Sequence, residues 1–306
     1  MALQAIQSFF SGNPLDRADH LRKEPATMTD MLQSSEARFM LMLNGEILSD
    51  SIGGIYWLKH RQCAYLPLGT KIFLGLSDGA PHYAAALEGD TADFDGLFPD
   101  AKFRDARALG MKAGFAHPEL GIVAQARSML SWHSSHRFCA KCGTESELVK
   151  AGYERLCPAC EASHFPRTDP VVIMLALNGD EALVGRGPQL PPGYFSALAG
   201  FMEPGETIEE AVARELMEEA GVTATSVQIV ANQPWPWPSS LMIGCTATVT
   251  SKKLTLDETE IDEARWVTRD EATNALSGGS SDFMVPPPIA IAHDLIKHWI
   301  EGDKSS

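Results

Sequence analysis

The sequence has no run of apolar residues approaching the roughly 20 that a membrane-spanning helix needs. Its first residues lack the basic-then-apolar layout of a secretory signal peptide, and its last three are not the peroxisomal tripeptide. Basic residues are in deficit, 25 against 40 acidic ones, so the formal charge is −15. That balance disfavours coating nucleic acid or an anionic membrane through bulk charge, although it permits recognition of one nucleotide end through a metal. We therefore expect a cytoplasmic protein with no membrane partner.

Cysteine is scarce, with six residues in 306, and four of the six form two C-x-x-C pairs. The pairs are Cys139-Ala-Lys-Cys142 and Cys157-Pro-Ala-Cys160. This pattern supplies four thiolates for a tetrahedral Zn²⁺ in a reducing compartment, and such a closed site is structural. The alternative is a set of free or redox-active thiols.

The length suits more than one domain. In the first part of the chain, apolar segments 39–43, 63–66 and 71–76 predict strands and 118–133 predicts a helix. No catalytic signature and no long internal repeat is evident there. We expect a small α+β, Nudix-like domain at 1–130, a zinc ribbon at 131–167 and a catalytic domain at 168–300.

The catalytic part alternates strand and helix patterns. The continuous apolar run 171–177 predicts a strand buried on both faces, and strands are also expected at 182–185, 194–200, 227–231 and 241–249. A terminal helix is expected at 289–299. The fold class is therefore α/β, an α/β/α sandwich with a mixed sheet.

The segment 200–222 is a glycine-rich loop followed by a helix. Thr207 can cap the helix, Glu210 can complete a capping box, and Gly221 suits the left-handed position at its end. Three carboxylates, Glu215, Glu218 and Glu219, then fall on one helical face, where they repel one another. A solvated acidic face is one interpretation. The other is a site for a hard divalent cation completed by substrate phosphates.

The spacing of the segment favours the cation site. It contains Gly200, Glu206 six residues on, and then Arg214-Glu215-Leu216-x-Glu218-Glu219-x-Gly221-Val222. This matches the Nudix box, G-x5-E-x7-R-E-U-x-E-E-x-G-U, where U is apolar. Carboxylates with divalent metal suit attack of water on phosphorus, and no Ser or Cys nucleophile beside a base is evident.

Ten residues after the box, Asn232 begins a stretch in which three prolines alternate with two tryptophans. By itself this is either a stiff, aromatic-walled binding loop or a rigid crossover packed on the core. With the four cysteines upstream, the chain resembles the NADH pyrophosphatase subfamily of Nudix hydrolases, whose Q-P-W-P-F-P-x-S array Gln233 to Ser240 matches with Trp237 in place of Phe.

The resemblance implies cleavage of the pyrophosphate of NAD(H) to nicotinamide mononucleotide and AMP, and removal of an NAD cap from RNA 5′ ends, by a homodimer dependent on Mg²⁺ or Mn²⁺. The implied metal ligands are the Ala199 carbonyl, Glu215, Glu218, Glu219 and Glu260, with Arg214 orienting the glutamates. Spacing alone does not separate Glu260 from Glu258 or Glu263. The implied substrate contacts are Phe165, Phe201, Gln233, Pro234, Trp235, Pro236, Trp237, Pro238, Ser239, Ser240 and Ala290.

Two other hypotheses stay open at this stage. The enzyme could prefer another nucleoside diphosphate derivative, such as ADP-ribose, a diadenosine polyphosphate or coenzyme A. Alternatively, the ribbon could make the chain an RNA- or protein-binding module with an inactive box. The intact glutamates argue against the module. So does the charge of the ribbon, because only three basic residues occur between 137 and 150, too few to track a phosphate backbone.

Overall fold

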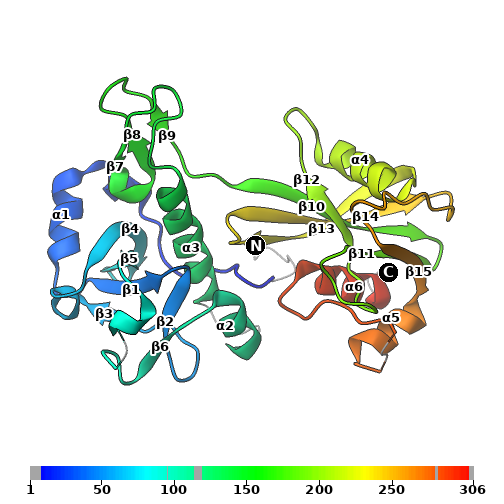
Figure 1. Ribbon diagram of the computed structural model, residues 1–306, viewed down its shortest axis with the longest axis horizontal. Coiled ribbons are helices and arrows are strands. Elements are labelled where there is room, and N and C mark those ends of the chain that lie inside the picture. Colours follow the sequence, from blue (N-terminus) through cyan, green and yellow to red (C-terminus); the bar gives the residue numbers. More distant parts are fainter. Residues whose placement is uncertain (1–7, 95, 114–118, 280–281, 303–306) are drawn as a thin grey trace. The chain divides into compact units, whose positions relative to one another are not determined.

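The computed structural model describes residues 8–94, 96–113, 119–279 and 282–302. The chain divides into two compact units. The C-terminal unit comprises residues 8–9, Asp169–Pro234 and the chain from Ser240 onward, and the N-terminal unit comprises Phe10–Thr168 and Trp235–Ser239. Each unit contains a six-stranded sheet (Figure 1). In the described ranges, no helix is long and apolar enough to cross a membrane.

The sheet of the C-terminal unit runs β13-β14-β10-β11-β15, with β12 beside β10. Strand β14 is parallel to β10, whereas β11 and β12 are antiparallel to it, so the sheet is mixed as predicted. The strands are β10 (Asp169–Asn178), β11 (Glu181–Arg186), β12 (Leu198–Phe201), β13 (Ala224–Trp235), β14 (Ser240–Val249) and β15 (Glu263–Thr268).

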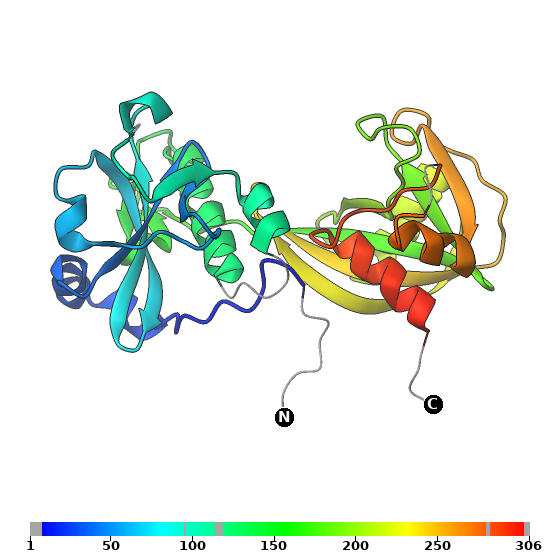
Figure 2. The ribbon, with the colours of Figure 1, turned by 90° about the horizontal axis from the view of Figure 1, so that it is seen from below.

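Side chains of β10 alternate between two cores, because successive residues of a strand point to opposite faces. Ile173 and Leu175 pack with helices α5 (Arg269–Leu276) and α6 (Ile291–Glu301). Val172 and Met174 pack with helix α4 (Ile208–Ala220). Figures 1 and 2 show α4 on one face of the sheet and α5 and α6 on the other. The predicted α/β/α sandwich is confirmed.

The sheet of the N-terminal unit repeats this strand scheme. It runs β4-β5-β1-β2-β6 with β3 beside β1, and β5 is parallel to β1 as β14 is to β10. Its strands are β1 (Arg38–Leu43), β2 (Glu46–Asp50), β3 (Leu58–Lys59), β4 (Leu68–Ser77), β5 (Ala80–Leu87) and β6 (Ala101–Arg104), with helices α1 (Pro25–Gln33), α2 (Ala106–Ala113) and α3 (Leu120–Ser135).

The two sheets differ at the connection that carries the box. Between β12 and β13 the C-terminal unit has the thirteen-residue helix α4, whereas between β3 and β4 the N-terminal unit has only the four-residue 3₁₀ helix η2 (His60–Cys63). The strand predicted at 63–66 is therefore wrong. Cys63 is buried at the end of η2, but Tyr65 is 97% exposed, and Pro67 follows without an amide hydrogen for a ladder.

The remaining strands of the N-terminal unit form a small separate sheet. Strands β7 (Glu147–Val149), β8 (Glu154–Leu156) and β9 (Ser163–His164) pair antiparallel in that order. The turns beside them carry the four cysteines.

Candidate active site

Helix α4 begins and ends where the sequence predicts. The Thr207 hydroxyl oxygen accepts a hydrogen bond from the Glu210 amide at 3.2 Å, and the Glu210 carboxylate accepts one from the Thr207 amide at 2.8 Å. At the other end, Gly221 takes φ 68°, which a residue with a side chain rarely adopts. These caps fix the two ends of α4, and Ala211, Val212, Leu216 and Ala220 pack its inner face into the core.

Arg214 holds the carboxylates of this region in place. Its Nε and Nη2 donate to the two oxygens of Glu206 at 2.6 and 3.0 Å, which with the Glu203 amide lowers the pKa of Glu206 to about 2. Its Nη1 donates to Glu215 at 2.8 Å and to Glu218 at 2.9 Å. Its Nη2 also reaches the Phe201 carbonyl at 2.9 Å. The rigid guanidinium fork is engaged by protein groups, which fits the predicted role of Arg214 in orienting the glutamates.

Glu215 and Glu219 are buried carboxylates on the inner side of α4, 7% and 5% exposed. Burial, reinforced by the nearby Glu215, Glu260 and Glu218, raises the pKa of Glu219 to about 8. Its Oε2 atom is buried without a hydrogen-bond partner. An unpaired buried carboxylate oxygen is costly unless something neutralises it. This donor set therefore fits a hard divalent cation, which prefers carboxylate oxygens.

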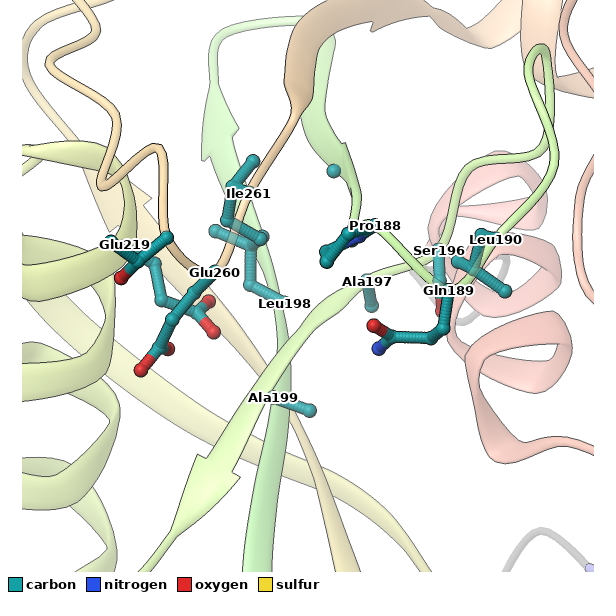
Figure 3. Close-up of a pocket in the computed structure, with 13 residues that line it drawn as sticks. Pro188, Gln189, Leu190, Ser196, Ala197, Leu198, Ala199, Glu219, Glu260 and Ile261 are labelled. Atoms are coloured by element: carbon teal, nitrogen blue, oxygen red, sulfur yellow. The ribbon is translucent and has the colours of Figure 1, made fainter.

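A cavity of about 470 Å³ lies beside Glu219. Glu219, Glu260 and Ala199 line it, and Figure 3 shows the two glutamates together at one side. Glu260 comes from a loop shaped by Asp257, whose side chain accepts from the Thr259 amide at 2.9 Å. Glu263 instead lies 3.6 Å from Arg186. Of the three glutamates that spacing left open, Glu260 is the one that lines the cavity.

Sequence analysis missed other residues that line the same cavity. Gln189 and Leu190 come from the loop after β11, and Ser196, Ala197 and Thr259 are among the other lining residues. In Figure 3 the Gln189 carboxamide extends into the cavity from the side opposite the glutamates. The composition of this loop, Gly187-Pro-Gln-Leu-Pro-Pro-Gly193, could have indicated it, because its prolines and glycines end the strand shortly before the box.

The predicted substrate array is divided in the structure. Gln233 is fully buried in the C-terminal unit, where its amide nitrogen donates to the Ile289 carbonyl at 2.9 Å and its oxygen accepts from the Ile291 amide at 2.9 Å. Pro234 belongs to the same unit, and Ser240 begins β14. Gln233 thus ties the end of β13 to the start of α6. Ala290, partly exposed, is the N-cap residue of α6.

Residues 235–239 of the array belong to the N-terminal unit, as does Phe165. Trp235 and Trp237 are half-buried, Pro236 is buried and Pro238 is exposed. Ser239 also lies in this segment. Phe165 and Phe201 are 62% and 63% exposed, so these two aromatic rings are not part of a core.

The four cysteines form one cluster, with sulfur atoms all within 4.8 Å of one another. The Cys142 and Cys157 sulfurs are 3.4 Å apart, and those of Cys139 and Cys160 are 3.6 Å apart. Four sulfurs at the usual Zn–S bond length of about 2.3 Å stand roughly 3.8 Å apart in a tetrahedron. The cluster therefore fits a structural zinc ion, as predicted.

Comparisons with known proteins match three segments of the chain to family models. Residues 167–284 match the model described as NUDIX domain. Residues 134–165 match the NADH pyrophosphatase zinc ribbon domain, and residues 36–132 match the NADH pyrophosphatase-like rudimentary NUDIX domain. The NAD-capped RNA hydrolase NudC of Mycobacterium bovis is 34% identical over 298 residues, which cover 93% of this chain and 92% of that protein. The chain belongs to the Nudix family.

Other Nudix relatives are similar over a smaller share. The human NAD-capped RNA hydrolase NUDT12 is 52% identical over 193 residues, 60% of this chain and 42% of that protein. The human mitochondrial NAD(P)H pyrophosphatase NUDT13 is 37% identical over 200 residues, 61% of this chain and 57% of that protein. The chain therefore spans about half the length of these two curated relatives.

Proposed function

We propose that this chain hydrolyses the pyrophosphate bond of NAD(H) to nicotinamide mononucleotide and AMP, and that it removes NAD caps from RNA 5′ ends by the same reaction. The observation that carries the proposal is the buried, unpartnered Oε2 of Glu219 beside Glu215, at a cavity that Glu260 also lines. The names of the relatives, NAD-capped RNA hydrolase and NAD(P)H pyrophosphatase, support the choice of substrate.

The proposed catalytic ion is Mg²⁺ or Mn²⁺, held by the Ala199 carbonyl and by Glu215, Glu218, Glu219 and Glu260. When bound, such an ion neutralises the diphosphate and lowers the pKa of an attacking water. Zn²⁺ is proposed for Cys139, Cys142, Cys157 and Cys160 as a purely structural ion.

The protein's own residues position the carboxylates of the site. Arg214 fixes Glu215 and Glu218 from one side, so the carboxylates are oriented before substrate arrives. The oxygen of water joins one phosphorus, the bridging oxygen leaves with the other phosphate, and the two protons of water pass to the product phosphates or to solvent. Phosphoryl transfer of this kind needs positioning and charge neutralisation more than covalent help.

Aromatic side chains are proposed to bind the bases of the substrate. Phe201 follows directly on Gly200 of the box and is exposed, as is Phe165. A stacked base is worth about 1–3 kcal/mol. Trp235, Pro236, Trp237, Pro238, Ser239 and Ser240 are proposed to border the substrate, Ala290 to contact it, and Gln233 and Pro234 to hold that loop.

The assembly and location are proposals as well. We infer a homodimer with domains at 1–130, 131–167 and 168–300. We infer a cytoplasmic location because the spacing of the two C-x-x-C pairs fits zinc thiolates, which persist in a reducing compartment. Light scattering on the purified chain tests the dimer, since a mass near 33 kDa rather than twice that value would contradict it.

The proposed activity is tested by product analysis. Purified protein with Mg²⁺ is offered NADH, NAD-capped RNA, ADP-ribose, a diadenosine polyphosphate and coenzyme A in parallel. We expect AMP and reduced nicotinamide mononucleotide from NADH, a 5′-monophosphate on the decapped RNA, and lower kcat/KM for the other three. Preferred cleavage of one of those three would mean that the chain is a Nudix hydrolase with that substrate instead of NAD(H). No turnover of any substrate would contradict the proposed hydrolase activity.

A further inference from the structure

The two tryptophans of the array form a compact aromatic cluster inside the N-terminal unit. The Trp235 and Trp237 ring centroids are 4.7 Å apart. Phe10 meets Trp237 edge-on at 5.3 Å and Trp235 at 6.2 Å. Trp237 also packs against the core of the unit that contains α3. The loop tip, residues 235–237, is therefore held by protein contacts before any ligand binds.

Arg127, from α3, contacts this tip in two ways. Its Nε donates to the Pro236 carbonyl at 2.8 Å, and its guanidinium lies 5.3 Å from the Trp237 ring centroid. Its Nη1 donates to the carbonyl of Gly45, in the β1–β2 turn. A Cβ at Gly45 would stand 2.7 Å from that nitrogen, and Gly45 has φ 84°. The turn thus leaves room for the arginine to reach the loop.

Arg107, from α2, contacts the same rings. Its guanidinium lies 4.5 Å from the Trp237 centroid and 5.4 Å from that of Trp235. Two cations beside one indole repel each other, and the Asp105 carboxylate offsets part of that repulsion at Arg127. Each cation is also attracted to the electron-rich face of an aromatic ring, an interaction strongest for tryptophan. Trp237 is therefore contacted by both arginines, by Phe10 and by Trp235.

We propose that Arg127, assisted by Arg107, is a positioning residue that holds the tryptophan loop ready for the base of a dinucleotide substrate. In this arrangement Trp237 anchors the loop and Trp235 offers the stacking surface. The two arginines then contribute to substrate binding without touching substrate, because a loop ordered in advance loses less entropy on binding. This inference rests on the proposed function of the site.

The kinetic test uses Arg127→Ala, Arg127→Lys and, as a matched control, Arg61→Ala, which removes an exposed arginine of the same unit. We expect Arg127→Ala to raise KM for NADH about tenfold, the scale of one lost charge-assisted hydrogen bond and one cation–π contact, with kcat changed less than about twofold. Lysine, which lacks the planar fork, should recover only part of the loss. Arg61→Ala should match wild type. An unchanged KM in Arg127→Ala would overturn the proposal.

A double-mutant cycle distinguishes positioning from a general loss of structure. If Arg127 acts through the loop, the effects of Arg127→Ala and Trp237→Ala on KM should be strongly non-additive, and additive effects would contradict the proposal. A second measurement needs no substrate. Acrylamide quenching of tryptophan fluorescence should rise in Arg127→Ala over wild type, but should not differ between Trp237→Ala and the double variant. Equal quenching of Arg127→Ala and wild type would sink the inference even if NADH proved not to be a substrate, whereas failure of wild type to cleave NADH counts only against the proposed function.

Discussion

The carboxyl group of Glu215 fills the space that a side chain at Gly200 would need. A Cβ placed on Gly200 would stand 1.9 Å from the carboxyl carbon of Glu215. Gly200 pairs with Val172 in the sheet, so the backbone there has little freedom to retreat. The first glycine of the box is therefore a space requirement of the carboxylate, and not a requirement for a special backbone angle.

Replacing Gly200 with alanine should push the Glu215 carboxylate out of place. We expect kcat/KM for NADH to fall by about a hundredfold, since misplacement by 1 Å carries that cost, while the fold persists. Steady-state kinetics and circular dichroism together check this. Gly179→Ala is the control for kinetics, because a Cβ there meets nothing within 4 Å and its φ of 60° adds only backbone strain, which the circular dichroism reports. Near-wild-type activity in Gly200→Ala would contradict the geometry.

We expect Glu219 to destabilise the folded protein in the absence of a divalent cation. Its buried, unpartnered carboxylate is raised in pKa to about 8. Glu219→Gln should therefore abolish turnover yet increase the free energy of unfolding by about 2 kcal/mol at pH 7 without Mg²⁺. Urea unfolding measures this, with Glu258→Gln, an exposed neighbour of the loop, as the control. A less stable, inactive Glu219→Gln would show a structural role instead.

The buried His133 gives the N-terminal unit a predictable response to pH. Its Nε2–H donates to the Gly152 carbonyl at 2.8 Å, and its Nδ1 accepts from Arg155 at 3.1 Å, so the ring is neutral. Burial, with the Arg155 charge, lowers its pKa from 6.5 to about 4. Between these values the unfolded chain binds a proton that the folded chain does not. The neutral His133 ring therefore makes its full contribution to the free energy of unfolding above pH 6.5. That contribution decreases as the pH is lowered below 6.5.

The matching variant is His133→Gln, whose amide can still donate to Gly152. On moving from pH 7 to pH 5, wild type should lose about 2 kcal/mol more of its free energy of unfolding than the variant. Urea unfolding at both pH values supplies the comparison, which cancels the other titrating groups. Equal losses in the two proteins would show that His133 is not held neutral.

Zinc should depend on all four ribbon cysteines. Cys157 is fully buried in the cluster, and Cys157→Ser removes one of four thiolates. We expect the zinc content, measured by atomic absorption, to drop from one ion per chain to well below one, with a lower melting temperature. Cys63→Ser, a buried cysteine in the same unit outside the cluster, should keep its zinc. Zinc retained by Cys157→Ser would remove the case for a four-thiolate site.

Local signals in the sequence predicted the parts of the fold that short segments determine. Thr207, Glu210 and Gly221 defined the ends of α4 because capping is decided within one helical turn. The continuous run 171–177 identified β10, and the cysteine spacing identified the ribbon. The segment 63–66 failed for the complementary reason, since four apolar residues become a strand only if a partner strand is in reach.

Relationships between distant segments were not visible in the sequence. Gln233 has the position of a substrate residue in the array, yet only the fold brings it against Ile289 and Ile291. The contact between Arg127 and Pro236 spans 109 residues and has no local pattern. The shared strand order of the two sheets also left no internal repeat, because alternating apolar residues define a sheet without requiring particular residue types.

The most direct test of the central claim is to locate the divalent ion. A crystal soaked with Mn²⁺ and AMP should show an anomalous peak roughly 2.2 Å from carboxylate oxygens of Glu215 and Glu219, with Glu260 facing it, since Mn²⁺ resembles Mg²⁺ in its preference for oxygen ligands. The same soak of Glu219→Gln should lose or weaken that peak. A protein that cleaves NADH in the presence of Mn²⁺ but shows no peak at these carboxylates would contradict the account.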